Sequence, residues 1–200
     1  MMSRTHGYGV RCLGVGAALA IAALSGCLTS QGPAPQLVGA VALAPAAQVD
    51  TEPERWILVR KTQRTLSLYE GKRVLKTYPV VLGRDPVWAK LYEGDHRTPE
   101  GEYHIVKKYF HPFWERFMLL DYPTPFNETI YGWSRRNGLL PVRGSGVPDI
   151  GGAIGIHGTA DDGLNRRGIN WTEGCISLLS HDVDELYDLV PVGTRVVIGR

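Results

Sequence analysis

From residue 56 onward, the chain is a succession of short runs in which β-branched and aromatic residues alternate with polar ones. Alternation with a period of two is typical of strands that bury one face, because successive side chains point to opposite sides of a sheet. Turn-forming residues separate the runs and favour antiparallel neighbours. The expected strands of this part lie at residues 56–59, 65–69, 74–78 with a continuation through 80–82, and 103–106. This pattern predicts a mainly β domain.

The C-terminal part predicts three more strands, at residues 153–157, 175–178 and 195–198, and one helix that begins after residue 179. Ser180 is the expected N-cap of this helix, and Pro191 follows its end. Its apolar residues have the spacing of one helix face and are Val183, Leu186, Tyr187 and Val190. The fold class is therefore mainly β with one or a few short helices.

Residues 110–152 are rich in proline, glycine and aromatic residues and have only weak periodicity. We predict long loops in this stretch, with a single strand at residues 117–121.

The N-terminus has the three parts of an export signal. A basic start without acidic residues precedes an apolar run at residues 13–24, and small residues come before Cys27. The run is shorter than the roughly 20 residues needed to span a bilayer. The segment Leu24-Ser25-Gly26-Cys27 resembles a bacterial lipobox, which implies cleavage before Cys27 and lipidation of its thiol. The alternative is an ordinary secretory signal that is cut later, at Ala46-Ala47.

These features divide the chain into a lipoprotein signal peptide at 1–26, a lipidated Cys27 with an Ala/Pro-rich tether at 27–53, and a folded domain at 54–200. A flexible tether of this length holds the domain about 25–30 Å from the anchor on average. Leu28 after Cys27 favours the outer membrane, with the domain in the periplasm. The formal net charge is only +2 and no basic stripe is present, which argues against a nucleic-acid partner.

The cysteines point to a reactive thiol in the folded domain. Of the three cysteines, Cys12 leaves with the signal and Cys27 is used for the lipid, so that Cys175 alone remains. An unpaired thiol in an exported protein is exposed to oxidation, and a catalytic nucleophile explains why it is kept. A buried, inert cysteine is the alternative.

A histidine stands in the right context to activate this thiol. His157-Gly158-Thr159 lies at the end of one expected strand, and Thr172-Glu173-Gly174-Cys175 leads into the next. A cysteine is mostly protonated at neutral pH, and an imidazole that takes its proton makes the thiolate nucleophile. The glycines at 158 and 174 let backbone approach a substrate and can direct N–H groups at an oxyanion.

The two segments His157-Gly158-Thr159 and Thr172-Glu173-Gly174-Cys175-Ile176 resemble the active-site signature of the L,D-transpeptidase (YkuD-like) family. The resemblance extends to Gly83, Lys90, the stretch Gly94–Gly101 and the closing strand at 192–198. It implies a sandwich-like β domain in which Cys175 attacks a peptidoglycan stem peptide. The resulting thioester is then resolved by an amine.

The family resemblance also implies roles for individual residues. His157 is the expected base, oriented by the Gly158 carbonyl, and the N–H groups of Gly174 and Cys175 form the expected oxyanion hole. Thr159 and Thr172 are candidate substrate contacts, although Thr172 also fits a structural role. The chain departs from the family at Glu173, where a histidine is common, and at Ser177, where an arginine or asparagine is common. Arg166 or Arg167 is a candidate replacement for binding the substrate carboxylate.

Two other functions remain open at this point: a cysteine hydrolase on the same scaffold, and a wall-binding lipoprotein that has lost catalysis. No cofactor and no metal site are expected, because no histidine or cysteine pair has ligand spacing. Trp133 and Trp171 are candidates for lining a groove for glycan or peptide, although we favour packing in the core or in loops. Surface or loop positions are expected for the remaining histidines His96, His104, His111 and His181. The sequence leaves the oligomeric state open.

Overall fold

The computed structural model describes Gly32, residues 54–144 and residues 146–200. The predicted signal peptide at 1–26, the lipidation site Cys27 and the rest of the tether at 27–53, Gly32 excepted, lie outside the described residues.

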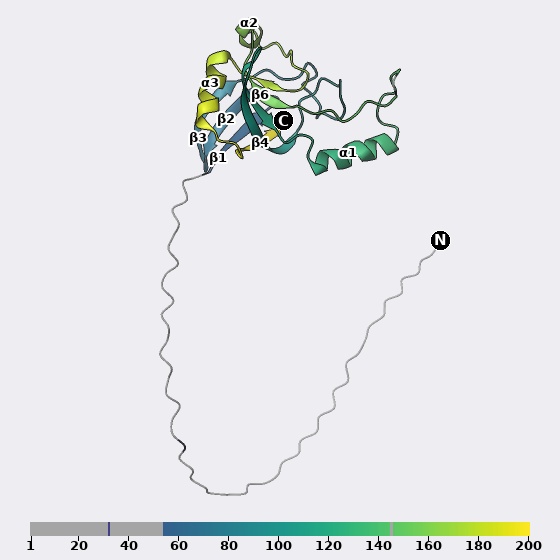
Figure 1. The fold of residues 1–200 in the computed structure, drawn as a ribbon, viewed down its shortest axis with the longest axis horizontal. Coiled ribbons are helices and arrows are strands. Elements are labelled where there is room, and N and C mark those ends of the chain that lie inside the picture. The colour runs from purple at the N-terminus through teal and green to yellow at the C-terminus, as the bar shows by residue number, and fades with distance from the viewer. Residues whose placement is uncertain (1–31, 33–53, 145) are drawn as a thin grey trace, which may run out of the picture. The chain divides into compact units, whose positions relative to one another are not determined.

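The domain is built on one sheet of eight strands, in the order β3-β2-β1-β8-β4-β5-β6-β7 (Figure 1). The strands are β1 (Arg55–Arg60), β2 (Thr65–Glu70), β3 (Arg73–Pro79), β4 (Gly101–His111), β5 (Glu115–Leu120), β6 (Gly155–His157), β7 (Ile176–Ser177) and β8 (Arg195–Gly199). Every strand expected from the sequence has a counterpart, and the mainly β, sandwich-like class is confirmed.

Most neighbouring strands are antiparallel, as expected, but two pairs are not. β1 pairs with β8 in parallel, and β6 pairs with β7 in parallel. Parallel neighbours need a crossover connection, whereas antiparallel ones can be joined by a tight turn. Between β6 and β7 that connection contains the short helix α2 (Asp162–Arg166). The antiparallel prediction, made for the strands at residues 56–106, is confirmed for β1–β2 and β2–β3, and the two parallel pairs involve C-terminal strands that it did not cover.

The sheet is curled so strongly that its two ends approach each other. The long strand β4 pairs with β8 through residues 101–104 and with β5 through most of its remaining length. Val81, just after β3, forms an antiparallel bridge with Ser177 of β7 at the opposite end of the strand order. The expected strand continuation at 80–82 therefore joins the two ends. A single core of aliphatic and tyrosine side chains fills the space inside this curl.

The helix α1 (Pro125–Arg136) corrects the prediction of loops at 110–152. Its start is fixed by Thr124, whose N–H donates to Asn127 Oδ1 over 3.0 Å. Ser134 is its only buried residue, whereas Phe126, Ile130 and Trp133 are exposed. Phe126, Ile130 and Trp133 have the spacing of one helix face, but this face is exposed, and the prediction missed it among the surrounding proline and glycine residues. None of the helices in the described residues is long and apolar enough to span a membrane.

The helix α3 (Ser180–Leu189) matches the predicted helix, and it buries Val183 and Leu186. Its N-cap is Leu179 and not the expected Ser180. The Ser180 hydroxyl instead donates to the Thr159 carbonyl oxygen, 3.1 Å away.

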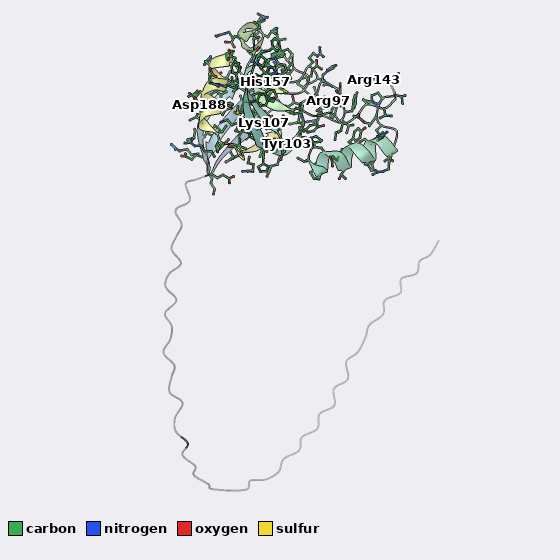
Figure 2. All side chains as sticks on the ribbon, viewed as in Figure 1. Arg97, Tyr103, Lys107, Arg143, His157 and Asp188 are labelled. Atoms are coloured by element: carbon green, nitrogen blue, oxygen red, sulfur yellow. The ribbon has the colours of Figure 1, made fainter. Side chains whose placement is uncertain are left out.

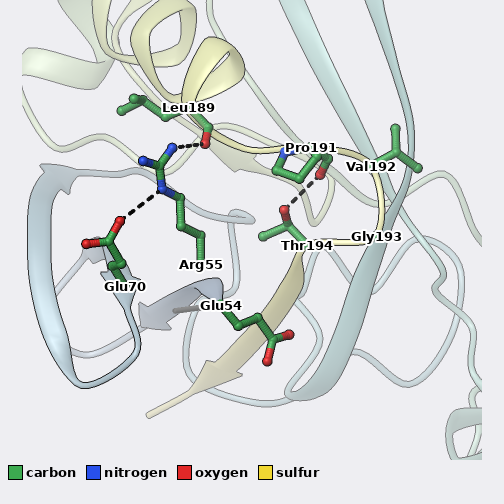
Figure 3. Close-up of a pocket in the computed structure, with 8 residues that line it drawn as sticks. All are labelled: Glu54, Arg55, Glu70, Leu189, Pro191, Val192, Gly193 and Thr194. Atoms are coloured by element: carbon green, nitrogen blue, oxygen red, sulfur yellow. Dashed lines mark hydrogen bonds and ion pairs between the residues drawn. The ribbon is translucent and has the colours of Figure 1, made fainter. Parts of the chain in front are cut away.

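Two cations from the sheet satisfy the C-terminal carbonyls of α3. Lys108 Nζ donates to the carbonyl oxygens of Tyr187 and Val190 at 2.5 and 2.7 Å. Arg55 donates to the Leu189 carbonyl at 2.9 Å and pairs with Glu70 (Figure 3). Cations at this end favour the helix because the last carbonyls carry partial negative charge. Residues that line the pocket in Figure 3 therefore serve to cap the C-terminus of α3.

Candidate active site

The pairing of β6 with β7 brings the predicted base and nucleophile into one cavity. Ile156 lies opposite Ile176, and His157 opposite Ser177, so that Cys175, which just precedes β7, lies beside the start of β6. His157 and Cys175 both line a cavity of about 230 Å³ together with Trp114, Trp171, Thr172 and Glu173. Figure 2 shows His157 within the body of the domain, whereas Arg143 lies at the far end of the segment that carries α1. Two segments separated in sequence thus meet at one site.

The His157 ring is held by a backbone carbonyl. Its Nδ1 lies 2.6 Å from the Gly158 carbonyl oxygen, the contact that the family resemblance led us to expect. A carbonyl can only accept, so Nδ1 carries the proton and Nε2 keeps the free electron pair. The imidazole is therefore in the tautomer that a general base needs.

Aromatic side chains surround this imidazole. The rings of Trp114 and Phe117 stack near it, with centroids at 4.7 and 5.4 Å, and Trp171 meets it edge-on at 5.7 Å. His157 is only 1% exposed. This burial lowers the pKa of His157 to about 4, although the Gly158 carbonyl acts in the opposite direction.

The Cys175 thiol is also held in its neutral form. Its Sγ lies 3.6 Å from the Ala153 carbonyl oxygen, to which the thiol donates. Burial raises the pKa of the thiol to about 11, and the Gly155 N–H and the Lys90 charge oppose this only in part. Both groups are therefore neutral near pH 7, and a thiolate at Cys175 would form only by transfer of the thiol proton to a base.

The turn before Cys175 is fixed by Thr172. Thr172 Oγ1 donates to the Cys175 carbonyl at 2.7 Å and accepts from the Gly174 N–H at 3.2 Å. Gly174 has φ of +140°, and a Cβ there would lie 2.6 Å from the Arg97 carbonyl oxygen. The Gly174 N–H is thus engaged, which corrects its assignment to the oxyanion hole. The Cys175 N–H donates to no acceptor within the described residues, and it keeps that assignment.

Two further residues of the signature serve packing. The Gly158 N–H donates to the Trp114 carbonyl at 3.0 Å, and a Cβ at 158 would lie 2.8 Å from both that oxygen and Val183. Gly158 therefore approaches protein backbone and not a substrate, contrary to our expectation. Thr159 is buried, and its Oγ1 accepts from the Asp161 N–H at 3.0 Å. Of the two candidate threonines, only Thr172 lines the cavity.

The arginines proposed as carboxylate binders lie elsewhere. Arg166 is on α2, exposed, and paired with Asp162 at 3.4 Å, and Arg167 is the C-cap of that helix. Neither lines a cavity with Cys175. The cation that does so is Lys90, in a second cavity of about 500 Å³ that also reaches the sulfur.

This second cavity includes residues that the sequence analysis did not select. Tyr109, His111, Trp114 and Phe117 form an aromatic wall from β4, the following turn and β5. The expectation for His111 was a surface or loop position, and for Trp171 it was packing, yet each lines a cavity with Cys175. Trp133 instead projects from α1 into solvent. The clue available in the sequence was the density of aromatic residues at 109–117.

Lys90 is held by a buried ion pair with Asp95, 3.0 Å away. Asp95 also accepts from the N–H groups of Leu91, Tyr92 and Arg97. The Gly94-Asp95 motif thus builds the loop that places Lys90 beside the cavity.

The two departures from the family pattern are positioned differently. Glu173 is exposed, lines both cavities and pairs with Arg84 and His96. These partners lower the pKa of the Glu173 carboxyl despite the opposing effect of burial. Ser177 is fully buried, and its hydroxyl donates to the Gly158 carbonyl at 3.1 Å. No group of His, Cys, Asp and Glu side chains in residues 54–144 and 146–200 is arranged to hold a metal ion.

The described domain coincides with a known catalytic domain. The sequence model of the L,D-transpeptidase catalytic domain (YkuD) matches residues 54–198. The protein named L,D-transpeptidase YkuD from Bacillus licheniformis is 32% identical over 149 residues, which are 74% of this chain and 67% of that protein. Its namesake from Bacillus subtilis is 28% identical over 137 residues, or 68% of this chain and 61% of that protein.

A solved structure shows the same fold. The helical cell shape determining protein Pgp2 from Campylobacter jejuni matches with a TM-score of 0.55 and 24% identity, over 75% of this chain and 49% of that chain. The present chain thus spans about half the length of that protein. Because the match at 54–198 covers most of the sequence and the Bacillus licheniformis relative is 32% identical, this chain belongs to the L,D-transpeptidase catalytic domain (YkuD) family.

Proposed function

We propose that this protein is a cysteine-dependent L,D-transpeptidase that acts on peptidoglycan tetrapeptide stems. The observation that carries the proposal is the shared cavity of Cys175 and His157, with His157 Nδ1 engaged by the Gly158 carbonyl. Membership of the family supplies the reaction class, and this arrangement supplies a nucleophile and a base for it.

In the proposed reaction, Cys175 Sγ attacks the carbonyl carbon of the third stem residue while His157 Nε2 takes the thiol proton. The tetrahedral intermediate then expels the amine of the terminal D-alanine, which His157 protonates, and a thioester remains on Cys175. An acceptor amine, which gives a proton to His157, attacks this thioester; the C–S bond breaks as the amide bond forms, and the Cys175 sulfur regains its proton from His157. The Cys175 N–H is the proposed donor to the oxyanion.

Intact-protein mass measurement tests the first half of the reaction. The full-length chain, incubated with a tetrapeptide-stem muropeptide, should gain the mass of the stem without its D-alanine. Cys175→Ala should gain nothing, and His157→Ala should be acylated far more slowly. A wild-type chain that neither forms the adduct nor releases D-alanine would contradict the proposal.

The second half of the reaction decides between transfer and hydrolysis. We expect an added amine acceptor to appear in the product faster than oxygen from labelled water. The reverse result would favour the hydrolase reading, for which the acidic Glu173 at the rim of both cavities is the supporting feature.

We also propose that the chain is exported and anchored through lipid on Cys27, with the catalytic domain facing the periplasm. The support is the lipobox-like segment Leu24-Ser25-Gly26-Cys27 and the apolar run before it. Two or more acyl chains bind a membrane stably, whereas a single chain is marginal.

A further inference from the structure

The Gly158 carbonyl that orients His157 accepts a second hydrogen bond. His157 Nδ1 lies 2.6 Å from this oxygen, and the Ser177 hydroxyl donates to it over 3.1 Å. A carbonyl oxygen has two lone pairs and can satisfy both donors. The Gly158 carbonyl that orients the imidazole is thus also held by Ser177 of the neighbouring strand β7.

The Ser177 hydroxyl is itself oriented by Asn165 of α2. Asn165 Nδ2 donates to Ser177 Oγ at 3.0 Å and to the Leu178 carbonyl at 2.8 Å. The Ser177 oxygen thus accepts from Asn165, while its O–H donates to the Gly158 carbonyl. The two bonds form a chain in which each polarises the next.

The orientation of the Asn165 amide is fixed by Trp171. The indole Nε1 can only donate, and it does so to Asn165 Oδ1 at 2.8 Å. Nδ2 must therefore face Ser177. The Trp171 ring in turn meets the His157 ring edge-on, so these contacts close a circuit around the base.

We infer that Asn165 and Ser177 are positioning residues for His157, acting through the Gly158 carbonyl. This inference rests on the proposed role of His157 as general base. When His157 takes the thiol proton, its Nδ1–H becomes part of a cation and needs a fixed acceptor. Ser177 and Asn165 keep that acceptor in place, so that Nε2 keeps one orientation in the cavity that His157 shares with Cys175.

This inference also explains the departure at position 177. The family resemblance implies an arginine or asparagine at this position, and the serine side chain is shorter than either. Asn165, supplied by α2, extends the short side chain into a network. Ser177 is completely buried, which excludes a direct contact with substrate.

The test compares Ser177→Ala and Asn165→Ala with the hydroxyl-retaining Ser177→Thr, all in the full-length chain. Ser134→Ala is the matched control, because Ser134 is a buried serine that lines neither cavity with Cys175. The readouts are kcat and KM for D-alanine release from a tetrapeptide stem, the rate of Cys175 alkylation by iodoacetamide between pH 5 and 9, and Tm.

We expect Ser177→Ala and Asn165→Ala to lower kcat about 10- to 100-fold, as misplacement of a catalytic group does. Their KM should stay within about two-fold of the wild-type value, since no substrate contact is lost. Alkylation of Cys175 should slow in the same two variants. Ser177→Thr, which keeps the hydroxyl, and Ser134→Ala should both react at rates close to that of the wild type. A merely structural role would lower Tm without changing the alkylation rate of the folded protein.

The alkylation assay separates this inference from the proposed function. If the wild-type chain releases no D-alanine, but its alkylation depends on His157 and is slowed by Ser177→Ala, the transpeptidase proposal fails and the positioning role stands. If folded Ser177→Ala and Asn165→Ala react at the wild-type rate, the inference is overturned. It is also overturned if His157→Ala leaves alkylation unchanged.

Discussion

The ionisation of His157 links the site to the stability of the fold. Its pKa is about 4 in the folded chain against 6.5 when unperturbed, mainly because of burial. Between these values the unfolded chain binds a proton that the folded chain does not bind. The contribution of His157 to stability is therefore fully present above about pH 6.5 and is lost as the pH falls through about 4.

We expect this residue to remove up to about 3 kcal/mol from the free energy of unfolding between pH 7 and pH 4. Urea unfolding of the wild type and of His157→Gln across this range would measure the effect. The variant should lose less stability on acidification than the wild type does. Equal losses in the two proteins would show that His157 does not carry this linkage.

Asp95 lies in a loop, but we expect it to contribute strongly to stability through its buried ion pair with Lys90. Asp95→Asn removes the charge that compensates buried Lys90, and we expect it to cost about 3–5 kcal/mol. Asp85→Asn is the matched control, because Asp85 pairs with Arg97 in a partly exposed position, where an ion pair contributes about 1 kcal/mol or less. Urea unfolding should give a much lower midpoint for Asp95→Asn than for Asp85→Asn. Equal midpoints would contradict this prediction.

At single residues, the sequence predicted that His157 and Cys175 lie together, and the structure places both in one cavity, while their catalytic roles stay a prediction. His157 and Cys175 stand out because each lies in a short motif, and the resemblance pairs them. Asn165 carried no such signal, since its role depends on how α2 folds back over β7. Arg166 and Arg167 were selected for their charge, but the turn of α2 places both outside the cavities.

At the level of elements, predictability followed burial. The strands β1, β2 and β8 alternate buried and less buried positions, and their sequences show this directly. Helix α1 also has apolar residues at helical spacing, but they are exposed, and the surrounding proline and glycine residues led to a prediction of loops. The parallel pairing of β1 with β8 joins residues that lie near opposite ends of the domain's sequence, and no local sequence pattern indicates which strands become neighbours.

The two longer helices should respond differently to loss of an apolar side chain. Leu186 of α3 is completely buried, and Leu186→Ala should cost about 2–5 kcal/mol through lost burial and the cavity left behind. Phe126 of α1 is mostly exposed, and Phe126→Ala should change stability by about 0.5 kcal/mol or less. Thermal or urea unfolding of both variants measures this. A costly Phe126→Ala would mean that α1 packs against something in solution.

On the scale of the whole domain, the curl of the sheet makes the site. The bridges Val81–Ser177 and Gly83–Thr172 join the chain after β3 to the segment that carries Cys175. A Cβ at Gly83 would lie 2.2 Å from the His96 carbonyl oxygen, so the glycine permits this close approach. Short strands such as β6 and β7 are held from both sides, which explains how elements of so few residues can position a base and a nucleophile.

The proposed lipid on Cys27 would attach the whole molecule to a membrane. In Cys27→Ala the proposed attachment of lipid is impossible. Wild-type protein should sediment with membranes after a high-salt wash and incorporate labelled fatty acid, whereas Cys27→Ala should do neither. Cys12→Ala is the matched control and should behave as wild type, because residue 12 belongs to the segment removed on cleavage. Incorporation of labelled fatty acid into Cys27→Ala at the wild-type level would reject the anchor on Cys27.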